Sequence, residues 1–218
     1  MGGFTGALIL AVVDWLAVYF NKLNWRWLTK TGVMLCLVAA YLASGGWQIS
    51  FWFGLGLVFS LAGDVFLLLP RRYFPAGLFS FLMAHIAYII ALNQPPPPQH
   101  PAAFLSAAVL LATAFSAFRH ISSALQTYPS GRWLTRAVLT YILVISAMVY
   151  SAFSTLWNPA WDFRAALMAS SGALLFYLSD WTLARQRFIR STQSGRTLVM
   201  VTYHLAQFGL TVSFLLRR

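Results

Sequence analysis

Long apolar runs dominate this sequence, and they constrain its fold more than any other feature. A helix that spans a bilayer needs about 20 mostly apolar residues, and eight runs come near that length. They are Phe4–Phe20, Thr31–Ser44, Trp47–Leu69, Pro75–Leu92, Ala102–Phe118, Trp133–Phe153, Phe163–Leu183 and Thr197–Leu216. The sequence therefore predicts an all-α fold, a polytopic membrane helix bundle with eight transmembrane helices, in which residues 1–218 form a single domain.

Composition excludes the main alternatives. Of the 218 residues, 60% are hydrophobic and 9% are charged, and the mean hydropathy is +0.71. A soluble domain could not cover that much apolar surface with a polar shell. The net charge of +11 does not indicate a nucleic-acid partner, because the basic residues lie in short loops rather than on one polar face. Cys36 stands alone, which excludes a disulfide framework and a cysteine metal cluster.

Basic residues concentrate in alternate loops and predict the orientation of the chain. The connections after the first, third, fifth and seventh runs contain Lys22, Arg26, Lys30, Arg71, Arg72, Arg119, Arg132, Arg136, Arg185, Arg187, Arg190 and Arg196. The other side has only Arg164, next to Asp162, and the terminal Arg217 and Arg218. Since Lys and Arg favour the cytoplasmic side, we expect a multi-pass protein of a bacterial inner membrane whose two termini face outward.

Acidic residues are few, and most of them fall inside the apolar runs. The sequence has no glutamate, and its four aspartates are Asp14, Asp64, Asp162 and Asp180. An ionisable group in hydrocarbon costs about 2.5–3.5 kcal/mol on insertion scales, so it is a functional candidate by default. Asp64 and Asp180 both lie about 8 Å inside the basic face at 1.5 Å per residue. A purely structural role, an interhelical hydrogen bond or a pairing with an arginine, is the alternative, and it is favoured for Asp14.

Other polar side chains lie at a similar depth. His85 and His204 are expected about 10–15 Å from the same face. Residues three or four positions from one another share a helix face, which adds Ser60, Tyr88, Tyr177, Tyr203 and Gln207 to the candidate set. Each half of the chain also reads aspartate, basic loop, histidine. This pattern suggests a possible 4+4 internal repeat that would bring the two aspartates towards a shared axis.

Two neighbouring carboxyl groups in a low-dielectric site do not both ionise easily, so one keeps its proton. Such a pair offers an acid and a base at neutral pH, which fits peptide hydrolysis, acetal-like hydrolysis through an oxocarbenium ion, or proton-coupled transport. A metal site from Asp64, His85, Asp180 and His204 is the further alternative, but no close ligand spacing supports it. We expect no metal and no other cofactor.

Four segments carry a family resemblance: "SLAGDVFLLLP", "FLMAHIAYII", "GALLFYLSDWTLA" and "YHLAQFGL". Together, and in this order, they resemble the YhhN-like lysoplasmalogenase family of multi-spanning membrane proteins. The resemblance implies hydrolysis of the vinyl ether bond of a lysophospholipid, the lysoplasmalogen, to a fatty aldehyde and a glycerophospho-ethanolamine or -choline. Asp64 and Asp180 correspond to the candidate catalytic pair of the family. Family members often show Lys-Pro where this chain has Lys30-Thr31, so the sequence assigns no role to Lys30.

The resemblance and the chemistry together suggest roles for the remaining polar residues. Those expected to position the water or the glycerol backbone are Ser60, His85, Tyr88, Tyr177, Tyr203, His204 and Gln207. Arg71, Arg72, Arg185 and Arg187 could hold the lipid phosphate, or they could only reflect the charge bias of the loops.

Two other functions remain open from the sequence. In an intramembrane aspartyl protease, Gly63-Asp64 would belong to a Gly-x-Gly-Asp pattern, but Leu61 breaks that pattern and the second aspartate lacks a preceding tyrosine. In a lipid or proton-coupled transporter, the buried acids would be relay or binding groups.

Overall fold

The computed structural model describes residues 2–127 and 131–217, and all regular structure in these residues is helical. The α-helices are α1 (Gly2–Tyr19), α2 (Arg26–Ala43), α3 (Gly46–Ile49), α4 (Phe51–Leu68), α5 (Phe74–Leu92), α6 (Pro101–Leu125), α7 (Gly131–Ser154), α8 (Phe163–Phe188) and α9 (Gln193–Leu216). Short 3₁₀ turns at Leu23–Trp25, Arg71–Tyr73 and Thr155–Trp157 precede or follow them.

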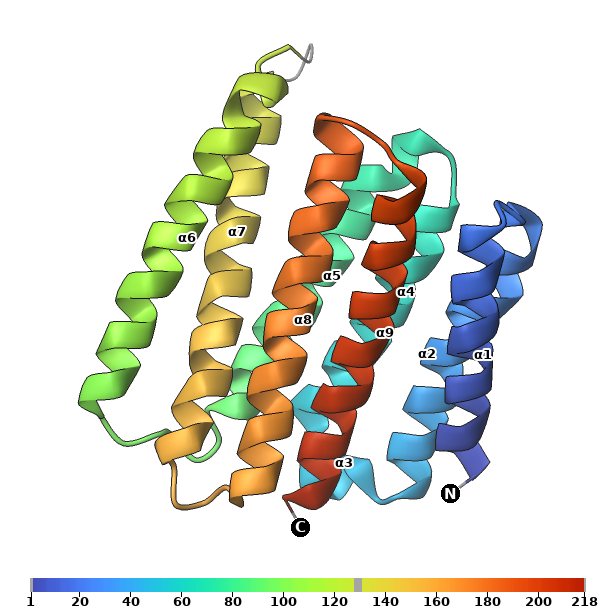
Figure 1. The fold of residues 1–218 in the computed structure, drawn as a ribbon. Helices are drawn as coiled ribbons and strands as arrows, with labels where there is room; N and C mark the ends of the chain where they lie inside the picture. The colour runs from blue at the N-terminus through green and yellow to red at the C-terminus, as the bar shows by residue number, and fades with distance from the viewer. Residues whose placement is uncertain (1, 128–130, 218) are drawn as a thin grey trace.

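The long helices stand side by side in one bundle (Figure 1). Successive contacts from α1 through α2, α4, α5, α7, α8 and α9 return to α1, so these helices close a ring. Helix α6 lies outside the ring, against α7 and α8. Both ends of the chain lie at one end of the bundle in Figure 1, opposite the α1–α2, α4–α5 and α8–α9 connections. The basic loops and the chain ends therefore lie at opposite ends of the molecule.

Six of the described helical segments are long and apolar enough to cross a membrane. They are α1, α4, α5 with its preceding turn, α6, α7 with its following turn, and α9. Helices α2 and α8 are 18 and 26 residues long, but their polar residues lower their mean hydropathy. The all-helical membrane bundle is thus confirmed with six candidate spans. Eight spans and the equivalence of two four-helix halves remain predictions.

Several of the expected boundaries are wrong. Helices α6 and α8 extend beyond Phe118 and Leu183, and α9 begins before Thr197. The run Trp47–Leu69 is not one helix, because Ser50 has an extended backbone between α3 and α4 and its side chain accepts a hydrogen bond from the Phe53 N–H. Serine in this position satisfies one of the free N–H groups of the first turn. The second helix begins at Arg26 rather than Thr31, so Lys30 lies within α2 and is buried instead of lying in a loop.

Helices α8 and α9 approach closely, backbone to backbone, at two glycines. A Cβ atom on Gly172 would lie 2.9 Å from the backbone nitrogen of Leu210 and 3.0 Å from the carbonyl oxygen of Ala206. A Cβ atom on Gly209 would lie 3.2 Å from the Cα of Gly172. Small residues let helix backbones approach closely in a membrane protein. This contact fixes the position of α8, the helix that carries Asp180.

We predict that Gly172→Ala lowers the stability of the bundle by about 1–3 kcal/mol, the usual cost of overpacking, because backbone atoms of α9 cannot yield to the new methyl group. Gly6→Ala is the matched control, since its Cβ would meet only the Cys36 Sγ, at 3.8 Å. The measurement is the midpoint of thermal unfolding in detergent. Equal midpoints for the two variants would contradict the prediction.

Candidate active site

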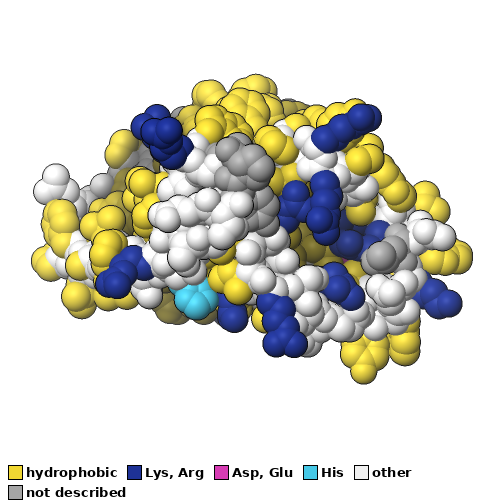
Figure 2. Space-filling model, turned by 90° about the horizontal axis from the view of Figure 1, so that it is seen from above, with side chains coloured by type: hydrophobic (Ala, Val, Ile, Leu, Met, Phe, Trp, Pro, Cys, Tyr) yellow, Lys and Arg dark blue, Asp and Glu magenta, His cyan; other side chains and the backbone are white. Residues whose placement is uncertain are grey.

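A pocket of about 300 Å³ opens at the end of the bundle where the basic loops lie. Figure 2 shows this end of the molecule, with Lys and Arg side chains gathered around a hollow. Four arginines line the pocket, Arg26, Arg71, Arg187 and Arg196, and its wall also contains Lys30, Asp64, Asp180 and Tyr203. Both aspartates singled out by the sequence therefore face one cavity, from α4 and from α8.

Asp64 is fully buried and has a cation as its partner. The Lys30 Nζ lies 2.8 Å from Asp64 Oδ1, and the Lys30 side chain is only 3% exposed. The Tyr203 hydroxyl donates a hydrogen bond of 2.8 Å to Asp64 Oδ2. A buried charge needs a partner of opposite charge and further hydrogen bonds to be tolerated. Lys30 supplies the charge, so this residue, to which the sequence assigned no role, belongs to the site.

A chain of hydrogen bonds leads from Tyr203 into the bundle. Gln207 Nε2 donates to the Tyr203 oxygen at 3.4 Å, and the Tyr88 hydroxyl donates to Gln207 Oε1 at 2.9 Å. Ser60 Oγ lies 3.3 Å from the Tyr88 oxygen and completes the chain. Ser60, Tyr88 and Gln207 are buried and are not among the residues that line the pocket. Their contacts hold the Tyr203 hydroxyl in place against Asp64.

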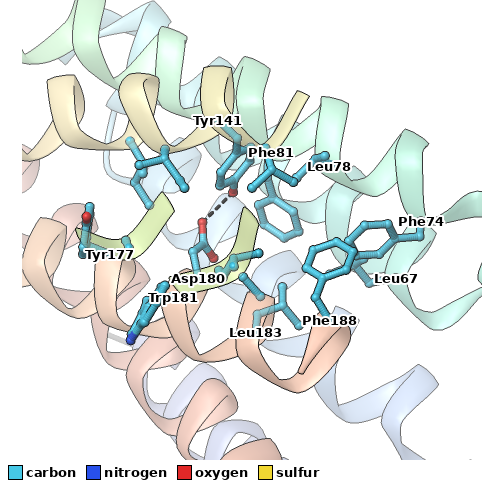
Figure 3. Close-up of a pocket in the computed structure, with 16 residues that line it drawn as sticks. Leu67, Phe74, Leu78, Phe81, Tyr141, Tyr177, Asp180, Trp181, Leu183 and Phe188 are labelled. Atoms are coloured by element: carbon cyan, nitrogen blue, oxygen red, sulfur yellow. Dashed lines mark hydrogen bonds between the residues drawn. The ribbon is translucent and has the colours of Figure 1, made fainter. Parts of the chain in front are cut away.

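Asp180 has a different set of partners. The Tyr141 hydroxyl donates to Asp180 Oδ2, as the dashed line in Figure 3 marks. His85 Nε2 lies 3.2 Å from the same carboxylate oxygen and 3.0 Å from the Tyr141 oxygen. The other ring nitrogen of His85, Nδ1, lies 3.3 Å from Met148 Sδ. Tyr141 was not predicted, because no motif or spacing links it to an aspartate 39 residues further along the chain.

The four residues of the possible metal site do not form one cluster. His85 contacts Asp180, whereas Asp64 pairs with Lys30. His204 accepts a hydrogen bond of 3.0 Å at Nδ1 from the Trp15 indole and is not among the residues that line the pocket. Within residues 2–127 and 131–217, no group of three or more His, Cys, Asp or Glu side chains is placed to hold a metal ion.

Asp14 supports the pocket from behind. It is buried in α1, where Thr29 Oγ1 donates a hydrogen bond of 2.7 Å to its Oδ1. Arg26 Nε lies 3.7 Å from the same oxygen, and Arg26 itself lines the pocket. Asp14 thus has the structural role that the sequence favoured. Its contact with Arg26 also links it to the wall of the pocket.

The basic residues named from the sequence divide into two groups. Arg71 and Arg187 line the pocket. Arg72 is exposed, where its Nη2 donates to the Tyr73 hydroxyl, and Arg185 is exposed on α8. Neither of these two is among the residues that line the pocket. Arg26 and Arg196 complete the rim instead, because α2 and α9 begin earlier than the apolar runs indicated.

An apolar cavity of about 60 Å³ adjoins the basic pocket. Asp180, Phe81 and Leu183 belong to the walls of both cavities. The remaining wall of the smaller cavity is apolar apart from the two tyrosines Tyr141 and Tyr177 (Figure 3). Asp180 therefore stands between a space suited to an anionic polar group and a space suited to hydrocarbon.

Fold and site together define a polytopic helical membrane protein with charged and hydrogen-bonded side chains enclosed in its bundle. The chain belongs to the YhhN family, which it matches over residues 25–214, so the resemblance found in the sequence motifs is confirmed. No solved structure matches this chain.

Named relatives come from animals and a slime mould. Human "Lysoplasmalogenase TMEM86A" is 33% identical over 160 residues, which are 72% of this chain and 62% of the human protein. Mouse "Lysoplasmalogenase TMEM86B" is 32% identical over 189 residues, 86% of this chain and 74% of the mouse protein. A "Lysoplasmalogenase homolog" of Dictyostelium discoideum is 26% identical. The chain thus spans less than two thirds of the length of the human relative.

We predict that Lys30→Met lowers stability by about 3 kcal/mol, since removal of one member of a buried ion pair leaves an uncompensated charge. Lys30→Met with Asp64→Asn should recover most of that loss, because the double variant buries no charge at this point. Thermal unfolding of both variants in detergent measures the difference. If the double variant is as unstable as Lys30→Met alone, the loss does not come from the charge on Asp64.

Proposed function

We propose that this chain is a lysoplasmalogenase, which hydrolyses the vinyl ether bond of a single-chain ether phospholipid to a fatty aldehyde and a glycerophospho-base. The printed names of the relatives support this activity. The position of Asp180 is the observation that carries the proposal. It lies between a basic pocket, which suits a phosphate, and an apolar cavity, which suits a chain. The vinyl ether bond of the substrate lies at the corresponding point, between its polar head and its hydrocarbon.

The contacts of His85 favour Asp180 as the proton donor. A thioether sulfur only accepts hydrogen bonds, so the hydrogen between His85 and Met148 belongs to Nδ1. On the other side, His85 Nε2, the Tyr141 oxygen and Asp180 Oδ2 lie within 3.2 Å of one another. The Tyr141 hydroxyl supplies one hydrogen to this group of three atoms. A second hydrogen is needed, because without it two of the atoms would face each other with lone pairs only. The His85–Asp180 pair therefore holds a transferable proton.

The contacts of Asp64 favour the opposite role. Its partner Lys30 is a cation, and the Tyr203 hydroxyl donates to it; both contacts favour the ionised carboxylate. An ionised carboxylate can orient a water molecule and accept its proton. The two aspartates thus differ in their surroundings, and such a difference lets one act as acid and the other as base.

The reaction then follows in balanced steps. The His85–Asp180 pair donates its proton to the β-carbon of the enol ether, and the C=C electron pair forms the new C–H bond. The α-carbon becomes part of an oxocarbenium ion, which the Asp64 carboxylate stabilises electrostatically. Water adds to the α-carbon and gives its proton to Asp64. As the hemiacetal breaks its C–O bond, Asp64 gives its proton to the departing alcohol oxygen and the His85–Asp180 pair takes the proton of the hemiacetal hydroxyl. These transfers release aldehyde and alcohol and restore both groups.

The basic mouth of the pocket fits the head group and indicates the membrane orientation. Guanidinium groups bind phosphate by paired hydrogen bonds, and four arginines line the pocket. Because Lys and Arg favour the cytoplasmic side, we place the pocket in the inner leaflet of a bacterial plasma membrane, with eight spans and both termini outward. The water-filled end of the pocket would release the water-soluble product to the cytoplasm.

Incubation of the purified protein with a lysoplasmalogen and measurement of aldehyde release tests the activity. Both Asp64→Asn and Asp180→Asn should lose about 10²–10⁴-fold in kcat, the usual range for acid–base catalysis. In D₂O the aldehyde should carry one deuterium on the carbon next to the carbonyl group. Full activity in either variant would remove the two-aspartate mechanism even if hydrolysis is real.

The same assay separates the two other functions. A transporter would move the labelled lipid between the leaflets of a vesicle without consuming it. An intramembrane protease would cleave a helical peptide and leave the vinyl ether intact. Either result, with no aldehyde formed, would overturn the proposal.

Arg71 and Arg72 provide a matched test of phosphate binding. Arg71 lines the pocket and its neighbour Arg72 is not among the lining residues. Arg71→Gln should raise the KM for lysoplasmalogen about 3- to 10-fold, because one exposed phosphate contact contributes on the order of 1 kcal/mol. Arg72→Gln should leave the KM unchanged. Equal effects of both substitutions would indicate general surface charge rather than a phosphate site.

A further inference from the structure

A third cavity continues the apolar space away from the site. It lies between α6, α8 and Phe153 at the end of α7, and its volume is about 490 Å³. Tyr177 lines both this outer cavity and the smaller one beside Asp180. From this continuity we propose that α6, α7 and α8 form a channel for one hydrocarbon chain, which leads from the reaction site to the lipid. The proposal rests on the proposed function for the identity of the chain, that of the lysophospholipid substrate.

One face of α6 forms a continuous wall for this channel. Ile121 and Ala117 line the inner cavity, and the α6 residues that line the outer one are Thr113, Leu110, Val109, Ser106, Leu105 and Ala102. Spacings of three and four residues place all of these positions on one helix face. The 20 residues from Ala102 to Ile121 extend over about 28 Å. This exceeds the roughly 15 Å that a chain occupies in one leaflet of a 30 Å hydrocarbon core.

The loose packing of α6 gives the channel access to lipid. Only 17% of the most apolar window of α6 is buried, against 50% for α7 and 61% for α9. Figure 1 shows α6 at the edge of the bundle, next to α7 and outside the ring. Large apolar side chains such as Leu105, Val109 and Phe115 are exposed along it. A chain can therefore enter sideways from the bilayer while its head group reaches the basic pocket.

The inner cavity is too small for two chains side by side. Its volume of about 60 Å³ is roughly twice the share of one water molecule in the liquid, so only a short segment of one chain can occupy it. Leu67, Phe74 and Phe81 line both this cavity and the basic pocket, so they form the wall between the two spaces. A phospholipid with two chains would have to place the second chain in the charged pocket. There the chain would remove water from around the arginines, which costs free energy. The channel thus selects single-chain substrates.

Tyr177 lies at the junction and sets the width of the channel. Within the part of the chain that the structure describes, its hydroxyl is buried without a hydrogen-bond partner. No hydrogen bond from the described residues therefore fixes the position of this hydroxyl. Leaving a buried hydroxyl unpaired costs about 1–3 kcal/mol. Its ring stands one turn from Asp180 on the same helix and marks the point that chain atoms must pass.

Trp181 permits a binding test that does not depend on hydrolysis, because it lines the inner cavity. The probe is a lysophosphatidylcholine with an ester bond and bromine atoms along its chain, added at low mole fraction to the protein in a lipid bilayer. Bromine quenches nearby indole fluorescence. The difference between the unsubstituted protein and Trp181→Phe isolates the signal of this residue. We expect that signal to fall at least two-fold and to recover when unlabelled single-chain lipid, but not two-chain lipid, is added in excess.

Ala117→Phe should block the channel, since Ala117 is 8% exposed and its side chain faces the inner cavity. Thr113→Phe is the second blocking variant, at an exposed position in the wall of the outer cavity, where folding tolerates the larger side chain. Ala112→Phe is the matched control, because Ala112 is exposed on α6 and lines none of the three cavities. Both blocking variants should lose the quenching, and the control should keep it.

The outcomes separate the channel from the enzyme activity. Quenching of Trp181 that both blocking variants abolish supports the channel, whether or not the protein releases aldehyde from a lysoplasmalogen. Aldehyde release without quenching of Trp181, or quenching that Thr113→Phe leaves unchanged, overturns the channel while the proposed activity stands. With active protein, Thr113→Phe should also lower kcat/KM at least five-fold for long chains and leave a substrate with an eight-carbon chain unaffected. Equal effects on both chain lengths would likewise overturn the proposal.

Discussion

The ion pair between Lys30 and Asp64 is the interaction on which the rest of the site depends. In a low-dielectric interior neither charge would be tolerated alone, and the pair joins α2 to α4 at the inner end of the basic pocket. Tyr203 then fixes the carboxylate from α9, and a buried chain of hydrogen bonds fixes Tyr203. Three helices that lie far apart in the sequence are held in register by one charged group and its partners.

The second carboxylate follows a different physical principle. Asp180 has a tyrosine and a histidine as partners, and these groups can share and transfer a proton, whereas a lysine mainly balances charge. In the proposed mechanism the two aspartates therefore differ in function, because their neighbours differ. The two cavities that share Asp180 also differ from each other in polarity. The arginine-rich pocket and the smaller apolar cavity meet at Asp180, and the proposed substrate would bind there with its head group in the first and its chain in the second.

Much of this organisation was predictable from residue type and spacing. The apolar runs predicted the helical bundle, and the rarity of acids singled out Asp64 and Asp180, which line one pocket. The failures have specific causes. Lys30 was counted as a loop charge, because the apolar run appeared to begin after it, whereas α2 begins at Arg26. Tyr141 lies in an ordinary aromatic and aliphatic helix, and only the packing of α7 against α8 brings it to Asp180.

The sequence by itself determined that the chain is a helical membrane protein, which residues are costly to bury, and which family it belongs to. These properties depend on local composition and on motifs, which a linear chain displays directly. Only the tertiary structure decided which cation faces which carboxylate, which arginines reach the pocket, and that an apolar passage continues past Tyr177. Such pairings depend on the rotation and depth of each helix against its neighbours, and helix packing sets these quantities through contacts between residues far apart in the chain.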